Sequence, residues 1–224
     1  MRVVLTRLSQ PWVASGRPAR HSAQMATLAR LPTEARRTMS AALAGDLDRV
    51  RHSSAVAEAA KQVGAHLPFE DQQVLVASAY LHDIGRSSAL AATGHHGLDG
   101  ALHLVGRFPE RIVALVAHHS EARWEAELRG LTGQLAAFPR EESIITDTLT
   151  YCDMTTGLAG QPISLDDRFN DVQRRYGSEH TVCRSLELAR PYIEAAVARV
   201  RRELLDASGH ARAQRSAAVS PPAR

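Results

Sequence analysis

Apolar residues along the chain recur with the spacing of α-helices, and no segment alternates convincingly with the two-residue period of a strand. Asp46 or Asp48 can cap a first helix, and the apolar residues that follow keep helical spacing as far as Gly64. Residues 74–81 are almost continuously apolar, which is typical of a helix at the centre of a bundle. Helices are predicted at residues 47–63, 70–83, 96–107, 109–119, 121–131, 141–154, 164–176 and 182–205. The sequence therefore predicts an all-α fold, a helical bundle of about seven to nine helices.

The bulk composition is that of an ordinary globular protein. At 224 residues, with 44% hydrophobic and 23% charged residues, the chain suits one domain with tails. No apolar run approaches the ~18 residues that span a bilayer, and the N-terminus lacks the short apolar core of a secretion signal. Cys152 and Cys183 form neither a metal-binding nor a redox motif. We expect a cytoplasmic protein with no membrane partner.

Charge is distributed unevenly and divides the chain into three parts. Residues 1–38 hold seven Arg and one Glu, a net charge of +6, and residues 207–224 hold three Arg and no acid. Residues 39–206 therefore carry a net charge of −6, which argues against nucleic acid as a partner. We predict a basic, poorly ordered N-terminal extension over 1–38, the helical domain over 39–206, and a disordered tail over 207–224.

The adjacent residues His82 and Asp83 end the central apolar run and are followed at once by Ile84 and Gly85. Aspartate is almost never fully buried unless it is paired or binds a metal ion. Together the two side chains offer one nitrogen and two oxygens to a divalent cation, and the carboxylate can bridge two cations. Because packing alone does not explain such a pair at the end of a core helix, it is the first candidate for a metal site.

Two residues on other predicted helices can complete a site around this pair. His52 lies on the first helix, and Asp153 lies near the end of the helix over 141–154. Taken alone, His52 reads as an ordinary core or surface histidine, and Asp153 as a cap for the threonines that follow it. The order His, His-Asp, Asp across an all-α pattern is the stronger signal. Asp147, six residues before Asp153, competes with it for the last position.

This order of residues resembles the HD superfamily of metal-dependent phosphohydrolases, and the segment from Leu81 to Gly85 is similar to its HD-I-G form. The resemblance covers about residues 46–176. Asp153 is preferred to Asp147 because its Tyr-Cys-Asp-Met context is similar to the late aspartate of the family. The resemblance implies that one divalent metal ion is held by four residues, His52, His82, Asp83 and Asp153.

Members of the superfamily with two metal ions add a histidine after the pair and a later His-His. The corresponding residues here are His96, His118 and His119, and Asp83 would bridge the two ions. The alternative is that some of these histidines donate hydrogen bonds to a bound phosphate. Imidazole and carboxylate ligands suit iron or manganese, so the resemblance implies one or two divalent transition-metal ions.

Other polar residues near these motifs are assigned to the surface. His95 and His103 are expected to be exposed. The helix over 164–176 is predicted to be amphipathic, with the basic residues Arg168, Arg174 and Arg175 on its outer face. Such a helix is more typical of a packing element than of a substrate clamp.

The chemistry that the resemblance implies is hydrolysis of a phosphate ester by a metal-activated water. Asp83 would take part in catalysis as the bridging ligand, and Arg86 could clamp a phosphate, with a solvent-exposed arginine as an equal alternative. The expected partner is a small phosphorylated substrate, a phosphate mono- or diester of a nucleotide or metabolite. Two alternatives stay open: a signalling module that keeps the metal site but mainly binds a nucleotide and a partner protein, and a di-iron oxygenase.

Overall fold

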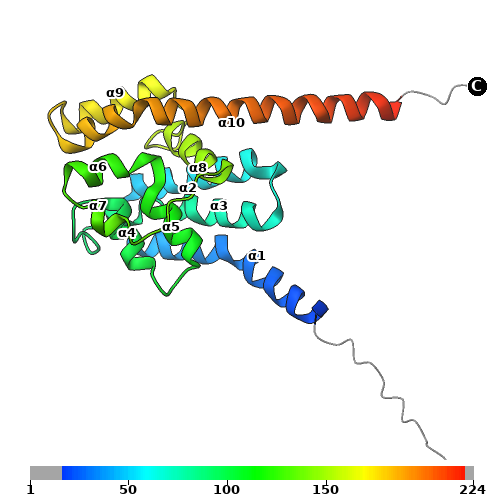
Figure 1. Cartoon of the computed structure of the whole chain (residues 1–224), viewed down its shortest axis with the longest axis horizontal. Coiled ribbons are helices and arrows are strands. Elements are labelled where there is room, and N and C mark those ends of the chain that lie inside the picture. Colours follow the sequence, from blue (N-terminus) through cyan, green and yellow to red (C-terminus); the bar gives the residue numbers. More distant parts are fainter. Residues whose placement is uncertain (1–16, 220–224) are drawn as a thin grey trace, which may run out of the picture.

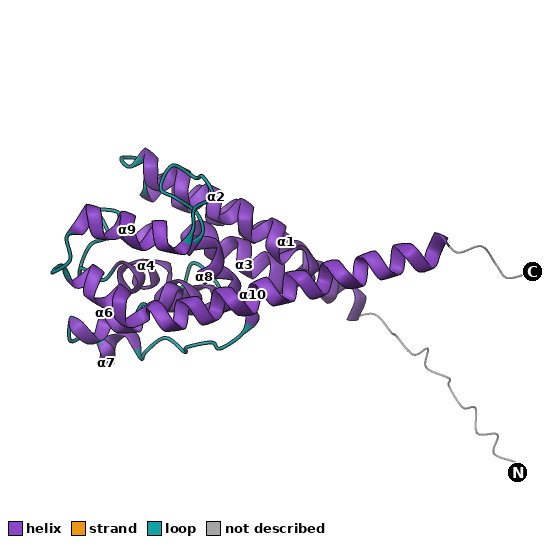
Figure 2. Ribbon diagram, turned by 90° about the horizontal axis from the view of Figure 1, so that it is seen from above, coloured by secondary structure: helices purple, strands orange, loops and turns teal. Residues whose placement is uncertain are grey.

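The computed structural model describes residues 17–219, with side chains over residues 24–207. The described chain is entirely helical apart from its connections and one isolated bridge between Thr156 and Pro162, and Figure 2 shows helices joined by loops. Its α-helices are α1 (Arg17–Ala42), α2 (Leu47–Val63), α3 (Phe69–Leu81), α4 (His96–Leu104), α5 (Glu110–His118), α6 (Arg123–Leu128), α7 (Thr132–Leu135), α8 (Ile144–Met154), α9 (Leu165–Tyr176) and α10 (Thr181–Val219). Its 3₁₀ helices are η1 (Gly64–His66), η2 (Ile84–Arg86) and η3 (His119–Glu121). The predicted all-α fold is confirmed, and α1 and the single-turn α7 raise the number of α-helices in the described range above the predicted seven to nine.

Helix α3 occupies the centre of the bundle, as its apolar run predicts. It packs against α1, α2, α5 and α8, so nearly every side of the helix meets another helix. Leu75, Ala77, Ala79 and Leu81 are fully buried. Figure 1 shows α1 and α10 on opposite sides of the bundle, with α3 between them. The central position of α3 explains why the residues at its C-terminal end are surrounded by other elements.

Side-chain caps fix the ends of the helices that carry the candidate site. Asp46 accepts a hydrogen bond from the backbone N–H of Arg49 at 3.0 Å and so begins α2. Ser143 caps α8, and Ser164 caps α9. Gly177, with a φ of +83°, ends α9 in a conformation that favours glycine. By fixing the residue at which each helix begins, these caps also fix which polar side chains of the helix face the core.

The N-terminal part of the fold differs from the prediction. Residues predicted to be a poorly ordered extension form α1 from Arg17 onward, and this helix packs on α3. Leu31, Ala35 and Met39, spaced by four residues, are buried along one face of α1. Their burial against the central helix makes this basic segment part of the fold. The first 16 residues, which belonged to the same prediction, lie outside the described residues.

The C-terminal part is also more helical than predicted. Helix α10 continues past the expected end at residue 205 to Val219, so most of the predicted disordered tail is helical, and residues 220–224 lie outside the described range. Ala and Arg, both good helix formers, make up half of residues 206–219. Figure 1 shows α10 running along the bundle and beyond it. Although α10 is long, no helix in the described part of the chain has both the length and the apolar character needed to cross a membrane.

Candidate metal centre

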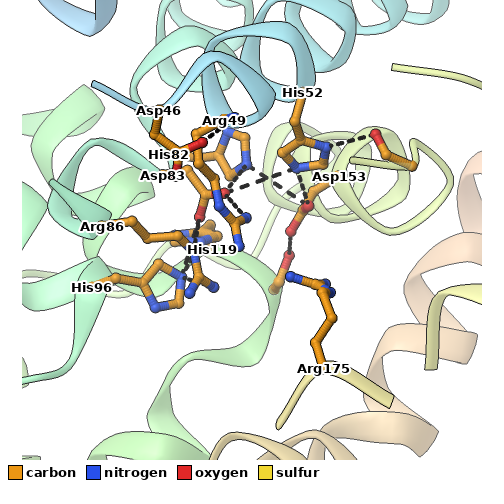
Figure 3. A network of polar contacts seen from close by, with 12 residues as sticks. Asp46, Arg49, His52, His82, Asp83, Arg86, His96, His119, Asp153 and Arg175 are labelled. Carbon is orange, nitrogen blue, oxygen red and sulfur yellow. Dashed lines mark hydrogen bonds and ion pairs between the residues drawn. The ribbon is translucent and has the colours of Figure 1, made fainter. Parts of the chain in front are cut away.

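Polar side chains from five parts of the fold meet beside the C-terminal end of α3 (Figure 3). Helix α2 supplies one histidine, the end of α3 supplies the His-Asp pair, α4 and η3 each begin with a histidine, and α8 supplies an aspartate. All of them are buried except the histidine of α4, whose side chain is 16% exposed. We call these six residues the His–Asp cluster: His52, His82, Asp83, His96, His119 and Asp153.

Asp83 lies between two groups of candidate ligand atoms. Its Oδ2 is 4.0 Å from His52 Nε2 and 3.8 Å from His82 Nε2, whereas its Oδ1 is 3.5 Å from His96 Nε2. Two triads form around it, and in each of them one ligand atom per residue lies within 4.8 Å of the others: His52–His82–Asp83 and Asp83–His96–His119. The carboxylate therefore presents one oxygen to each triad, which is the arrangement that a bridging ligand requires.

Asp153 adds a second carboxylate to the first triad. Its Oδ1 is 3.1 Å from His52 Nε2 and 3.7 Å from His82 Nε2. Its Oδ2 accepts a hydrogen bond of 2.6 Å from the hydroxyl of Ser120. Ser120 and Glu121 have φ values of +49° and +60°, a strained conformation for residues other than glycine. This strained turn is what directs the serine hydroxyl at the aspartate.

Backbone carbonyls fix the orientation of three histidines in the cluster. In each case Nδ1 faces a carbonyl oxygen, and the pairs are His82 with Ala79 at 2.7 Å, His119 with Val116 at 2.7 Å and His52 with Gly157 at 3.1 Å. A carbonyl oxygen can only accept, so Nδ1 carries the hydrogen and donates it, and in the neutral ring Nε2 keeps its lone pair. The first two pairs use carbonyls of the last helical turn, which lack partners within the helix. Hydrogen bonding of this kind typically orients metal-binding histidines.

The cluster meets a physical test for a cation site. His82 Nε2 is buried and has no hydrogen-bond partner among the described residues, which is costly for a polar atom. His119 Nε2 lies 3.1 Å from His96 Nε2, and its lone pair also faces inward. A divalent cation satisfies such inward-facing lone pairs, and imidazole with carboxylate is a common donor set for transition metals. The residues present therefore fit a divalent metal ion.

Burial and ion pairing set the charges of the cluster. Burial lowers the pKa of His82 to about 4, and burial together with the nearby Arg86 lowers the pKa of His96 well below its usual value. Burial alone would raise the pKa of Asp83, but Arg86 and Arg49 hold it well below its usual range. The rings of His82 and His96 are thus neutral at neutral pH, and Asp83 is ionised, as metal ligation requires.

Three arginines surround the two carboxylates. Arg49 Nη1 donates to Asp83 Oδ2 at 2.7 Å, and Arg86 Nε donates to Asp83 Oδ1 at 2.6 Å. Arg168 Nη2 donates to Asp153 Oδ1 at 3.0 Å. Arg86 thus points into the site, and the alternative of a solvent-exposed arginine is wrong, since only 22% of its side chain is exposed.

Sequence reasoning missed two of these arginines. Arg49 precedes His52 by three residues on α2, so helical spacing could have placed both on one face. Arg168 was expected on the outer face of its helix, but it is buried against the cluster. The polar composition of α9 hides which of its faces is turned inward, because most of its residues are charged or polar.

Two histidines lie elsewhere than predicted. His118 does not join the cluster, because its Nε2 donates to the carbonyl of Phe138 at 2.8 Å. Helix α5 ends at this residue, and the change to extended backbone at His119 sends the two neighbouring side chains in different directions. His95 was expected at the surface but is buried, where its Nδ1 caps α4 by accepting from Leu98 N. The structure brings together six of the seven predicted ligands, and metal binding itself stays a prediction.

The two candidate aspartates of α8 have different surroundings. Asp147 forms an ion pair with Arg199 of α10, with distances of 2.6 and 2.8 Å. Asp153 lies a turn and a half further along the helix and faces the cluster. The structure therefore places the preferred candidate at the site and its competitor outside it.

Comparison with known proteins identifies the family. Residues 49–171, more than half of the chain, match the family model of the HD domain. The chain belongs to the HD-domain superfamily of metal-dependent phosphohydrolases. HD domains bind divalent metals, and the match includes every residue of the His–Asp cluster. Among curated proteins and among solved structures, no significant match is found.

The neighbouring histidines at the end of α5 give a matched pair of variants for this HD domain. We expect His119→Ala to lower the manganese bound per chain by about one equivalent, because it removes a nitrogen from the second triad. His118→Ala should leave bound manganese unchanged and cost about 1 kcal/mol of stability through loss of its hydrogen bond to Phe138. Metal analysis after gel filtration, with urea unfolding, measures both effects. Equal loss of metal in the two variants would contradict the assignment of His119.

The low pKa of His82 predicts how the metal-free HD domain responds to acid. Its pKa in the fold is about 4, below the usual 6.5, so between these values the unfolded chain binds a proton that the folded chain does not. The free energy of unfolding should therefore fall as pH drops from 6.5 to 4, by about 3 kcal/mol from this residue. His82→Asn removes the titrating ring but keeps a donor for the carbonyl of Ala79. Urea unfolding in a chelator should show a smaller pH dependence for this variant, and an identical dependence would refute the prediction.

Proposed function

We propose that the protein hydrolyses a phosphate mono- or diester of a nucleotide or small metabolite, with one or two divalent transition-metal ions. The observation that carries this proposal is Asp83, whose two oxygens face two separate triads of candidate ligands. The first ion would be held by His52, His82, Asp83 and Asp153, and the second by Asp83, His96 and His119. Iron and manganese suit such ligands. When bound, these ions would act as Lewis acids and lower the pKa of a coordinated water toward neutrality.

Charge around the cluster favours an anionic substrate. The two carboxylates face three guanidinium groups, those of Arg49, Arg86 and Arg168, so bound divalent ions would make the site strongly positive. Phosphate oxygens accept hydrogen bonds from arginine with good geometry. The net charge of −6 over residues 39–206 supports a small-molecule partner rather than nucleic acid.

Two cavities beside the cluster give such a substrate room. One has a volume of about 80 Å³ and reaches His119, and the other has a volume of about 350 Å³ and is lined by Arg49 and Tyr176. Arg86 and His96 line both cavities. A phosphoryl group at the cluster could therefore have the rest of its ester in the larger cavity.

Arg86 is the residue that we propose as a phosphate clamp. Its Nη1 donates to the hydroxyl of Tyr176 at 3.2 Å, and its Nε holds Asp83. Burial alone would lower the pKa of Arg86, but Asp83 raises it, so the side chain stays charged. A guanidinium fixed in this way between the carboxylate and the larger cavity is positioned to bind an oxygen of the substrate.

The proposal is tested with a panel of phosphate esters and two metals. p-Nitrophenyl phosphate, bis(p-nitrophenyl) phosphate and common nucleotides are incubated with protein loaded with Mn(II), and again with Fe(II) under air. We expect release of p-nitrophenol or inorganic phosphate from at least one ester, and its loss with a chelator. Oxygen uptake without ester cleavage would instead favour the oxygenase, and nucleotide binding with neither activity would favour the signalling module.

A further inference from the structure

Arg168 is a buried arginine with hydrogen-bond donors to spare. Only 7% of its side chain is exposed, although it comes from α9, the most polar helix near the site. Its Nη2 donates to Asp153 Oδ1 at 3.0 Å and lies 3.4 Å from His52 Nε2. Its Nε and Nη1 are buried and have no hydrogen-bond partner within the described part of the chain. These two atoms carry three N–H groups, so more than half of the five donors of the guanidinium lack an acceptor.

Unsatisfied donors on a buried cation are unfavourable in a native fold. A buried donor without an acceptor loses its hydrogen bonds to water and gains none in the fold, and the loss is larger when the group is charged. Arginine cannot escape this cost by losing its proton. Arg168 lines the cavity of about 80 Å³ together with His119, Ser120 and Asp153, beside the candidate metal ligands. The unpaired donors thus belong to a side chain that borders a space in which an acceptor can bind.

A second arginine on the same helix brings more positive charge to the same place. Arg175 follows Arg168 by seven residues, two helical turns, so both lie on one side of α9. Figure 3 shows the Arg175 side chain extending toward the cluster. Burial lowers the pKa of Arg175, the neighbouring Asp171 raises it, and the nearby charges of Arg49 and Arg168 lower it further. The charges of Arg49, Arg168 and Arg175 therefore lie close enough to repel one another beside the cluster, and a bound anion would offset this repulsion.

We infer that Arg168 binds a non-bridging oxygen of a phosphoryl group, and that the small cavity beside Asp153 is the subsite for this tetrahedral oxyanion. The inference rests on the proposed function, since it assigns the place where the reacting phosphoryl group binds. It makes Arg168 a substrate-binding residue, in addition to its ion pair with Asp153. Arg175 supports it by adding positive charge close to Arg168.

Inorganic phosphate is the probe that tests this subsite, with titration calorimetry on manganese-loaded protein. Arg168→Met should weaken phosphate binding by about 10- to 100-fold, the usual effect of losing a hydrogen bond to a charged group. Arg168→Lys keeps a cation for Asp153 but lacks the planar set of donors, so it should retain metal while still binding phosphate more weakly than wild type. Arg174→Met is the matched control, because this neighbour on α9 has a side chain that is 76% exposed, and it should bind phosphate as wild type does.

The outcomes separate the subsite from the overall function. If Arg168→Lys keeps its metal and binds phosphate as tightly as wild type, Arg168 acts only through Asp153 and the inference is wrong. Absence of phosphate binding to the manganese-loaded wild type would overturn it as well. If phosphate binding depends on Arg168 but no ester is hydrolysed, the oxyanion subsite stands and the proposed hydrolase function fails. If esters are hydrolysed but replacing Arg168 does not change the affinity for phosphate, the proposed function stands and the subsite assignment fails.

Discussion

Replacing Asp83 with asparagine should lower phosphate-ester hydrolysis by about 10³-fold and remove most of the bound manganese. The amide keeps the size of the side chain but loses its charge and puts a donor where one triad needs an oxygen. Loss of metal assistance amounts to several kcal/mol of transition-state stabilisation, which corresponds to the expected fall in rate. The variant should also be less stable by about 3–5 kcal/mol, because Arg49 and Arg86 lose their buried partner. Metal analysis, initial rates with bis(p-nitrophenyl) phosphate and urea unfolding measure the three effects.

Asp147→Asn is the control for this experiment. It removes a carboxylate that pairs with Arg199 at the surface, where an ion pair contributes about 0–1 kcal/mol. This variant should keep wild-type metal content and activity. Wild-type metal content in Asp83→Asn, at a temperature where the variant is folded, would show that Asp83 is not a ligand.

Replacing Gly85 with alanine should destabilise the protein by about 3 kcal/mol or more and weaken the second triad. A Cβ atom at this position would lie 2.0 Å from the carbonyl oxygen of His96 and 2.5 Å from the backbone nitrogen of Gly100. Both atoms belong to the backbone of α4, so neither can swing aside, and η2 and α4 must move apart. Because η2 follows Asp83 and α4 begins at His96, this movement separates the oxygen and the nitrogen that the second triad needs. Urea unfolding and manganese binding report the two consequences.

Gly133→Ala provides the matched control in this case. No atom lies within 4 Å of the position that its Cβ would take, and the residue is in α7. Alanine there should leave stability unchanged or raise it by up to about 1 kcal/mol, because it is the better helix former. If Gly85→Ala unfolded at the same urea concentration as wild type, the close packing of η2 on α4 would be wrong.

The sequence predicted the centre of the site because that part depends on helical spacing and on adjacent residues. His82 and Asp83 end a continuous apolar run, so their burial followed from the run itself. His52 and Asp153 each lie on a helix with a clear cap and a buried face. The family resemblance, rather than any local pattern, predicted that these two residues share a site. In the structure His52 Nε2 lies 3.1 Å from Asp153 Oδ1.

The rest of the site depended on tertiary detail that spacing does not encode. The choice between His118 and His119 depends on where α5 ends and on the backbone turn that follows. Arg168 required knowledge of which polar face of α9 is turned toward the bundle. His95 is buried as a cap because the loop before α4 folds onto Ala122, a contact between residues far apart in the sequence.

The N-terminal helix was missed for a different reason. Its net positive charge suggested an extension, and this overall charge hid the apolar residues that recur every four positions from Leu31 to Met39. Periodicity was the better guide here, because a single apolar stripe is enough to bind a helix to the central α3. The arginines of this segment, such as Arg30, Arg36 and Arg37, are exposed and lie on the faces of the helix that point away from the bundle.

The central claim is that Asp83 joins two metal positions, and anomalous diffraction from crystals soaked in manganese tests it most directly. Data collected at the manganese absorption edge should show two peaks. One should lie among His52, His82, Asp83 and Asp153, and the other should be coordinated by Asp83, His96 and His119. Peaks located elsewhere, or manganese ions that Asp83 does not contact, would contradict the account.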